Sequence, residues 1–160
     1  MQFDISKIED CRAFAETVAN CARAPLTIGL IGTLGAGKTQ WTRFLALACG
    51  AETHSIASPT FTLVHHYPGR VDVYHIDTFR VKTAAEFYDL GVDELFEESA
   101  IVVIEWADRF SECLPPDRLD LRFELNGDNR SVEVLSGGQN SAQVVEILEA
   151  AWHKRLQDAS

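Results

Sequence analysis

The residues with the clearest potential for chemistry lie in the stretch G-T-L-G-A-G-K-T, residues 32–39. This stretch fits the phosphate-loop pattern G-x-x-x-x-G-K-[ST]. Its glycines let the backbone approach a ligand closely, so that successive N–H groups can point at phosphate oxygens. Lys38 would then reach the β and γ phosphates, and the Thr39 hydroxyl would be one ligand of Mg²⁺. The pattern predicts a nucleotide site with a magnesium ion.

The flanking segments are the ones that a phosphate loop needs. Residues 26–31 form a short apolar run, typical of a strand buried on both faces of a parallel sheet. Apolar residues at helical spacing follow the loop and end at Gly50, which can terminate a helix. This order of strand, loop and helix favours a phosphate loop over an ordinary glycine-rich turn.

Such a loop also needs an acidic side chain near the metal ion, and ligands of open α/β sheets collect at the carboxyl ends of strands. Glu105 follows the apolar run 101–104, and Asp77 ends the run 71–77. Both acids are therefore candidates for catalysis. One would act on the metal ion and the other on the attacking water, and the sequence leaves the assignment open.

Two further residues have a structural and a functional interpretation. Thr60 follows Ser58 and Pro59 at the start of a strand, so it either initiates that strand or senses the γ phosphate as a switch threonine. Trp106 directly follows Glu105. Its ring would stack on a base or a partner, or it would simply pack in the core.

Basic side chains are candidates for stabilising charge in a transition state, although isolated arginines are usually solvated. The candidates are Arg43, Arg80, Arg109 and Arg130. The histidines of the predicted hairpin lack the cysteine or acid spacing of a metal site, so we interpret them as packing or surface residues. They are His65, His66 and His75.

The pattern of the whole chain predicts one α/β domain over residues 1–160, with a three-layer fold of the P-loop NTPase type. Its parallel core sheet should carry antiparallel additions, namely a hairpin at 61–77 and strands within 118–135. Helices are expected at 8–23, after the loop lysine, and at 142–156. At 160 residues and 46% hydrophobic, the chain can bury a sizeable core.

Composition limits the classes of function. The formal net charge is -10, and proteins that grip nucleic acid through their own surface usually show a basic face. Any nucleic acid is therefore expected to be held by a partner. The four cysteines form no C-x-x-C pair, which favours reduced core thiols. No signal peptide or membrane-length apolar run is visible, so we expect a soluble, cytoplasmic protein.

Four segments together resemble the TsaE family of P-loop ATPases. They are G-T-L-G-A-G-K-T, S-P-T-F-T-L-V at 58–64, Y-H-I-D-T-F-R at 74–80 and I-V-V-I-E-W at 101–106. The phosphate loop alone occurs in many families, whereas the S-P-T segment and the E-W pair make the resemblance specific. The resemblance implies an ATPase of bacterial tRNA threonylcarbamoyladenosine synthesis. Its expected partners are TsaD and TsaB, which it would reset through Mg-ATP hydrolysis and through which alone it would meet tRNA.

The resemblance also implies roles for individual residues. Magnesium would be held by Thr39 and Glu105, and the positions of Thr60, Asp77 and Trp106 are motif residues tied to activity. The expected ATP-binding set is Gly32, Thr33, Leu34, Gly35, Ala36, Gly37, Lys38, Thr39, Trp106 and Arg130. The chain departs from the usual pattern at Thr33, Gln40 and Phe44. Of these, Phe44 is expected to affect how the loop helix packs.

Two other functions fit the same loop. A small-molecule kinase would need an acceptor pocket and an arginine-bearing lid that excludes water. A nucleotide-gated binding module would use ATP to hold a conformation and would scarcely hydrolyse it. The absence of the N-K-x-D pattern of regulatory GTPases favours adenine nucleotides in every case.

Overall fold

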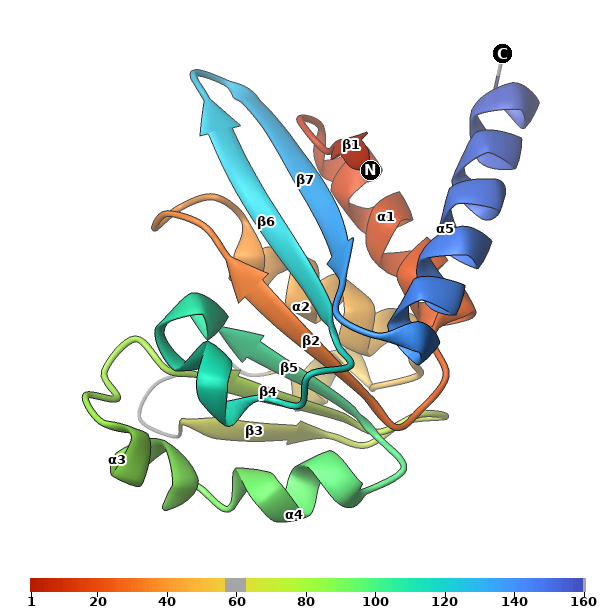
Figure 1. Ribbon diagram of the computed structural model, residues 1–160. Coiled ribbons are helices and arrows are strands. Elements are labelled where there is room, and N and C mark those ends of the chain that lie inside the picture. Colours follow the sequence, from red (N-terminus) through yellow and green to blue (C-terminus); the bar gives the residue numbers. More distant parts are fainter. Residues whose placement is uncertain (57–62, 160) are drawn as a thin grey trace.

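The computed structural model describes residues 1–56 and 63–159, and in them a mixed seven-stranded sheet lies at the centre (Figure 1). The strands are β1 (Gln2–Asp4), β2 (Leu26–Ile31), β3 (Val64–Tyr67), β4 (Val73–Asp77), β5 (Ile101–Glu105), β6 (Leu119–Asn126) and β7 (Asn129–Ser136). The helices are α1 (Ile8–Cys21), α2 (Lys38–Ala48), α3 (Ala84–Tyr88), α4 (Val92–Glu97) and α5 (Gln139–Asp158). Two 3₁₀ segments are η1 (Thr53–Ser55) and η2 (Ala107–Cys113).

The strand order is β1-β7-β6-β2-β5-β4-β3. Strands β6, β2, β5 and β4 run parallel to their neighbours in this central block. Strand β3 is antiparallel to β4, β7 is antiparallel to β6, and β1 is antiparallel to β7. The expected α/β fold with antiparallel additions is confirmed, with one refinement. Strand β4 of the expected hairpin, and β6 of the strands expected within 118–135, belong to the parallel block itself.

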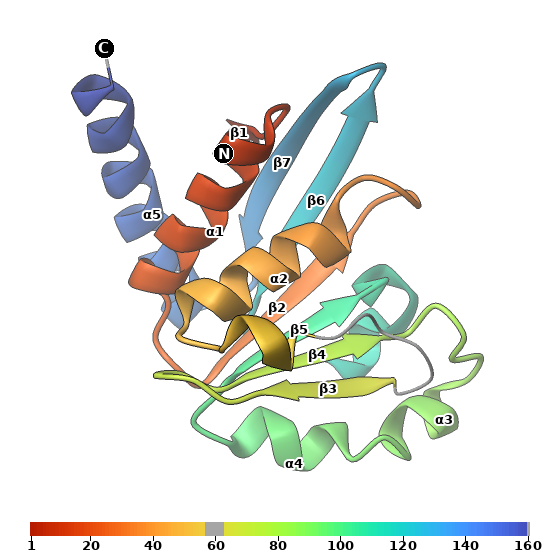
Figure 2. The ribbon, with the colours of Figure 1, turned by 180° about the vertical axis from the view of Figure 1, so that it is seen from behind.

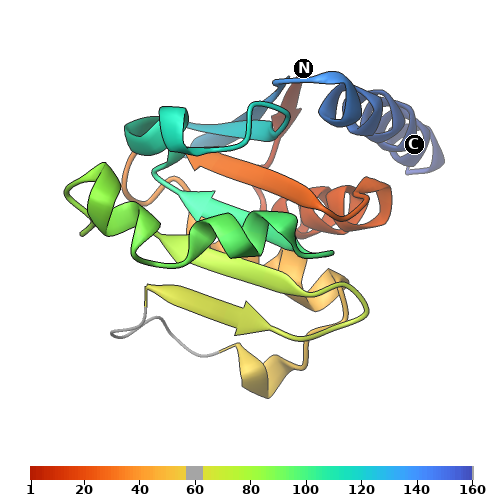
Figure 3. The same cartoon turned by 60° about the horizontal axis from the view of Figure 1, so that its bottom comes forward.

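Strand β5, which lies between β2 and β4, shows why helices must cover both faces of the sheet. All five of its residues are buried, and neighbouring side chains in a strand point to opposite faces. Ile101 and Val103 join a core cluster with α1 and α2, whereas Val102 and Ile104 join a second cluster with η2 and α3. Figures 2 and 3 show α1 and α2 on one face of the sheet and α3, α4 and η2 on the other.

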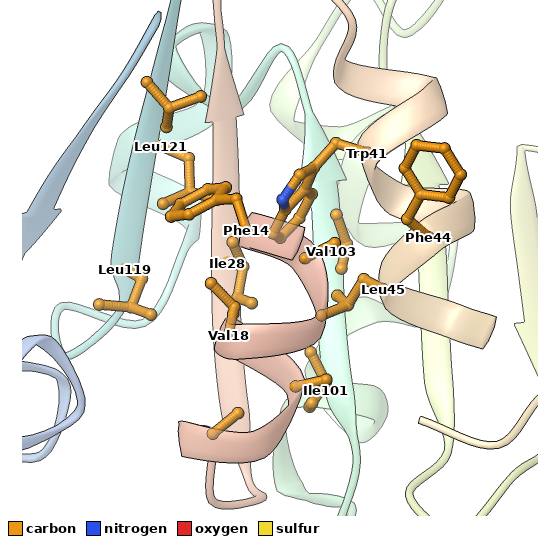
Figure 4. Packing of buried hydrophobic residues seen from close by; sticks show 14 of the residues in the cluster. Phe14, Val18, Ile28, Trp41, Phe44, Leu45, Ile101, Val103, Leu119 and Leu121 are labelled. Atoms are coloured by element: carbon orange, nitrogen blue, oxygen red, sulfur yellow. The ribbon is translucent and has the colours of Figure 1, made fainter. Parts of the chain in front are cut away.

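The larger cluster is centred on aromatic side chains of α1 and α2 (Figure 4). The ring of Phe14 lies 6.1 Å from that of Trp41, and Trp152 of α5 meets Phe14 edge-on at 6.0 Å. Phe44, one of the departures noted above, is also buried, and the guanidinium of Arg12 lies 4.9 Å from its ring. The loop helix is therefore packed firmly against α1.

Element boundaries differ from the sequence expectations in four places. Helix α1 ends at Cys21, two residues early, and α5 is longer than the expected 142–156 at both ends. Strand β4 begins at Val73 because residues 71 and 72 lie in the turn. Strand β1 was not predicted at all, since three residues give too short a pattern and its partner β7 lies far away in the sequence.

The cysteines behave as ordinary core residues. All four are free, three are buried and Cys113 is partly exposed. Burial raises the pKa of Cys11 to about 11, so this thiol stays protonated at neutral pH. This agrees with the expectation of reduced core thiols. None of the helices in the described ranges combines the length and apolar character needed to cross a membrane.

Candidate active site

The glycine-rich loop connects β2 to α2, and its backbone has the conformation that glycine permits. The φ angles are 149° at Gly32, 80° at Gly35 and 105° at Gly37. Such values are strained for residues with a side chain. At Gly32 a Cβ atom would also lie 2.6 Å from the carbonyl oxygen of Phe123, so both conformation and space require glycine there. Helix α2 begins at Lys38, as the motif predicts.

The Lys38 side chain is folded back over this loop. Its Nζ donates hydrogen bonds to the carbonyl oxygens of Gly32 at 2.7 Å and Thr33 at 2.9 Å, and it lies 4.2 Å from the centre of the Trp106 ring. Burial lowers the pKa of Lys38, although Glu105 and nearby aspartates oppose this shift. Among the described residues no ion pair involves Lys38. A buried ammonium without a direct counterion suits an anionic ligand.

The carboxylate of Glu105 lies beside the start of α2. Because β5 alternates, Glu105 points to the same face as Ile101 and Val103, which is the face covered by α2. Its Oε1 accepts a hydrogen bond of 2.7 Å from the hydroxyl of Thr39, 66 residues away in the chain. The side chains of the two residues predicted to hold magnesium are thus in direct contact.

His75 is the site residue that the sequence interpretation missed. It is buried, and its Nε2 lies 2.8 Å from the same Oε1 of Glu105. Burial alone would raise the pKa of Glu105, but the interactions with His75 and Thr39 outweigh it and hold that pKa below its ordinary value. Glu105 is therefore ionised, and Nε2 of His75 must carry the donated proton. By contrast, His66 lies half-exposed near Asp72, as expected of a surface histidine.

We expect His75→Phe to lower the free energy of unfolding by about 1–3 kcal/mol, because a buried carboxylate loses a hydrogen-bond donor. His75→Gln places an amide N–H near the position of Nε2 and should recover much of that loss. Urea denaturation of both variants measures the difference. Destabilisation by Gln with Phe like the wild type would show that the ring's shape matters and its hydrogen bond does not.

Asp77 lies next to Glu105 in the sheet, since the two residues are register partners of β4 and β5. Its Oδ1 accepts a hydrogen bond of 3.0 Å from the backbone N–H of Phe79. The hydroxyl of Thr78 donates to the carbonyl oxygen of Glu105 at 2.7 Å. The two candidate acids thus lie at the carboxyl ends of neighbouring strands, as predicted. The turn after β4 is bonded to the end of β5.

Trp106 has an unusual backbone conformation. Its φ is 61°, and no other non-glycine residue of the described ranges has a positive φ. Such strain is common at functional sites. One neighbour of the indole ring is the ammonium of Lys38, and another is the ring of Phe79 at 5.2 Å. The structure therefore places Trp106 at the phosphate loop and not within a core cluster.

Arg130 reaches the loop from β7, which lies on the opposite side of β2 from β5 in the strand order. It lines a cavity of about 310 Å³ together with Ser6, Gly35, Gly37 and Gln40. Arg109 is instead bonded to backbone carbonyl groups, and Arg80 is exposed. Of the expected loop residues, Leu34 is 79% exposed at the tip and Ala36 is buried. The expectation for Thr60 falls outside the described residues.

The oxygen ligands near the loop suit a magnesium ion that is shared with a nucleotide, and not a metal ion that is held by protein side chains alone. In the described part of the chain, no group of three or more His, Cys, Asp or Glu side chains is arranged to hold a metal ion. Mg²⁺ usually keeps several waters and binds one or two protein oxygens together with phosphate oxygens. The hydroxyl of Thr39 and the carboxylate of Glu105 supply such oxygens, so the residues present fit a magnesium nucleotide.

Comparisons with known proteins give relatives that match over most of this chain. The protein named tRNA threonylcarbamoyladenosine biosynthesis protein TsaE from Bacillus subtilis is 37% identical over 142 residues, 88% of each chain. The protein of the same name from Treponema pallidum is 33% identical over 127 residues, 79% of this chain and 93% of its own. The crystal structure of Bacillus subtilis YdiB matches with a TM-score of 0.78 at 27% identity, covering 94% of this chain and 95% of that one.

The family itself is identified by a model of conserved sequence features. The model described as "Threonylcarbamoyl adenosine biosynthesis protein TsaE" matches residues 5–132, which include the phosphate loop, both candidate acids and Arg130. The resemblance noted in the sequence is thereby confirmed. The chain belongs to the TsaE family.

Proposed function

We propose that this protein is a magnesium-dependent ATPase that acts in the synthesis of threonylcarbamoyladenosine in tRNA. The observation that carries the ATPase assignment is the hydrogen bond between Thr39 and Glu105, which joins the end of a phosphate loop to a buried, ionised carboxylate. The names of the TsaE relatives support the role in tRNA modification.

The side chains of the site divide the work of phosphoryl transfer to water. Mg-ATP supplies the transferable phosphoryl group and neutralises part of its charge. Lys38 and the N–H groups of the loop hold the phosphates. Because the hydroxyl of Thr39 donates a hydrogen bond to Glu105, the lone pairs of its oxygen remain available to Mg²⁺. Asp77, at the neighbouring strand end, orients the attacking water.

The cavity lined by Arg130 adjoins Gly35 and Gly37 of the loop, and in this proposal it takes the nucleoside of the bound nucleotide. Part of its lining is apolar, including Ile5 and Ile8, as the face of a base requires. Arg130 would bind the nucleotide there. We propose adenine as the base.

The expected partners are TsaD and TsaB. Hydrolysis by this protein would reset their complex between rounds of modification, and the partners would hold the tRNA, in keeping with the net charge of -10. This assignment places the protein in the cytoplasm. A small-molecule kinase is less well supported, because the guanidinium of Arg109 is already bonded to three backbone carbonyl groups.

Release of phosphate from ATP tests the proposal, measured with the protein alone and with the purified TsaD–TsaB complex. We expect slow hydrolysis alone and a rise of at least about tenfold with the complex, dependent on Mg²⁺. ATP binding without any stimulation would contradict the resetting role. A phosphorylated small molecule formed in place of free phosphate would identify a kinase instead.

A further inference from the structure

One side chain from another element, that of Arg109, is bonded to three carbonyl groups of the turn that follows β4. Arg109 lies in η2, four residues after Glu105. Its Nη1 donates to the carbonyl oxygens of Thr78 at 3.0 Å and Phe79 at 2.7 Å, and its Nη2 donates to that of Val81 at 2.8 Å. The turn belongs to no helix or strand, and the carbonyl oxygen of Thr78 also accepts the backbone N–H of Val81 at 3.0 Å.

The same turn contains the N–H group that fixes Asp77. The backbone N–H of Phe79 donates to the carboxylate of Asp77, and its carbonyl oxygen accepts from Arg109. The ring of Phe79 lies against Trp106, which precedes η2. A shift of the turn would therefore move the Asp77 carboxylate relative to the end of β5, where Glu105 lies.

We propose that Arg109 is a positioning residue, which holds the turn after β4 so that Asp77 faces the phosphate site in a fixed orientation. This inference rests on the proposed ATPase function. In this role Arg109 acts through the turn, to which its guanidinium is bonded, and not through direct contact with the nucleotide. The sequence interpretation gave Arg109 as a candidate for stabilising charge in the transition state, and the indirect role is a different one.

The chemistry of arginine suits this task. A guanidinium has five N–H donors in a rigid plane and is always charged, so it can bind several carbonyl groups in a fixed geometry. The ammonium of lysine is a point charge on a flexible stem and cannot reproduce that fork. Arg109→Lys therefore keeps the charge and removes the geometry, whereas Arg109→Gln removes both.

Arg23 offers a matched control. Its Nη1 also donates to three backbone carbonyl groups, those of Asn20, Cys21 and Ala22, but they lie at the end of α1. Arg23→Gln thus removes a similar set of contacts from another part of the fold. Any effect common to both arginines reflects general stability, and only the difference reports on the turn.

Amide hydrogen exchange of the nucleotide-free protein tests the positioning role without reference to activity. The N–H groups of Phe79 and Val81 are bonded to Asp77 and Thr78 respectively. In Arg109→Gln and Arg109→Lys we expect both amides to exchange about tenfold faster, and in Arg23→Gln at the wild-type rate. Unchanged exchange in the Arg109 variants would overturn the proposal, whatever the protein's function.

Kinetics then test whether the position of Asp77 is what matters. With the partner complex present, Arg109→Gln and Arg109→Lys should lower kcat about tenfold, with KM for Mg-ATP changed less than about twofold. In an Asp77→Asn background the Arg109 substitutions should have little further effect, because the oriented group is already lost. Fully additive losses would overturn the route through Asp77. A wild-type protein without ATPase activity would refute the proposed function, and the exchange experiment would still decide on the turn.

Discussion

Replacing Lys38 with alanine is expected to lower partner-stimulated ATP hydrolysis by about 10²–10³-fold, the loss typical of removing one preorganised charge from a phosphoryl-transfer or oxyanion site. The ammonium is bonded to two carbonyl groups of the loop, and burial increases its effect on a bound phosphate. Nucleotide affinity should fall as well, because Lys38 contacts the phosphates in the ground state. Phosphate release and calorimetric titration with ADP measure the two effects.

The fold should survive this change. Burial lowers the pKa of Lys38, which means that the folded state disfavours the charged form, so alanine removes an electrostatic cost together with two hydrogen bonds. We expect the free energy of unfolding to change by less than about 1 kcal/mol. Lys154→Ala, at an exposed lysine of α5, serves as the control for activity. Normal hydrolysis by Lys38→Ala would refute the phosphate-loop assignment.

The parts of the site that the sequence predicts correctly are those encoded over short distances. One continuous motif contains the loop, its glycines and the start of α2 at Lys38. Four consecutive apolar residues predict the buried strand that ends at Glu105. Arg130 lies far from the loop in the sequence and was predicted only from the family resemblance. In the structure it lines the cavity beside the loop. The roles of these residues remain predictions.

The parts that the sequence does not reveal depend on contacts between distant segments. His75 looks like an ordinary strand histidine until β4 pairs in parallel with β5, which brings it to Glu105. The alternation of β4 could have given the signal, because His75 lies two residues before Asp77 on the same face. The bonds of Arg109 to the turn gave no signal in the sequence, since its partners are backbone carbonyl groups. Short strand β1 and the left-handed backbone of Trp106 are likewise set by tertiary packing.

Replacing Glu105 with glutamine is expected to separate the charge of the carboxylate from its shape, and to lower ATP hydrolysis by about 10²-fold or more. Thr39 and His75 both donate to Oε1, so the amide oxygen of glutamine can accept the same two hydrogen bonds while the negative charge is lost. Nucleotide binding in EDTA should therefore be unchanged, whereas the gain in affinity on adding Mg²⁺ should largely disappear. Calorimetric titration with ADP under both conditions measures this, with Glu146→Gln on exposed α5 surface as the control. Magnesium dependence like that of the wild type would exclude Glu105 from the metal site.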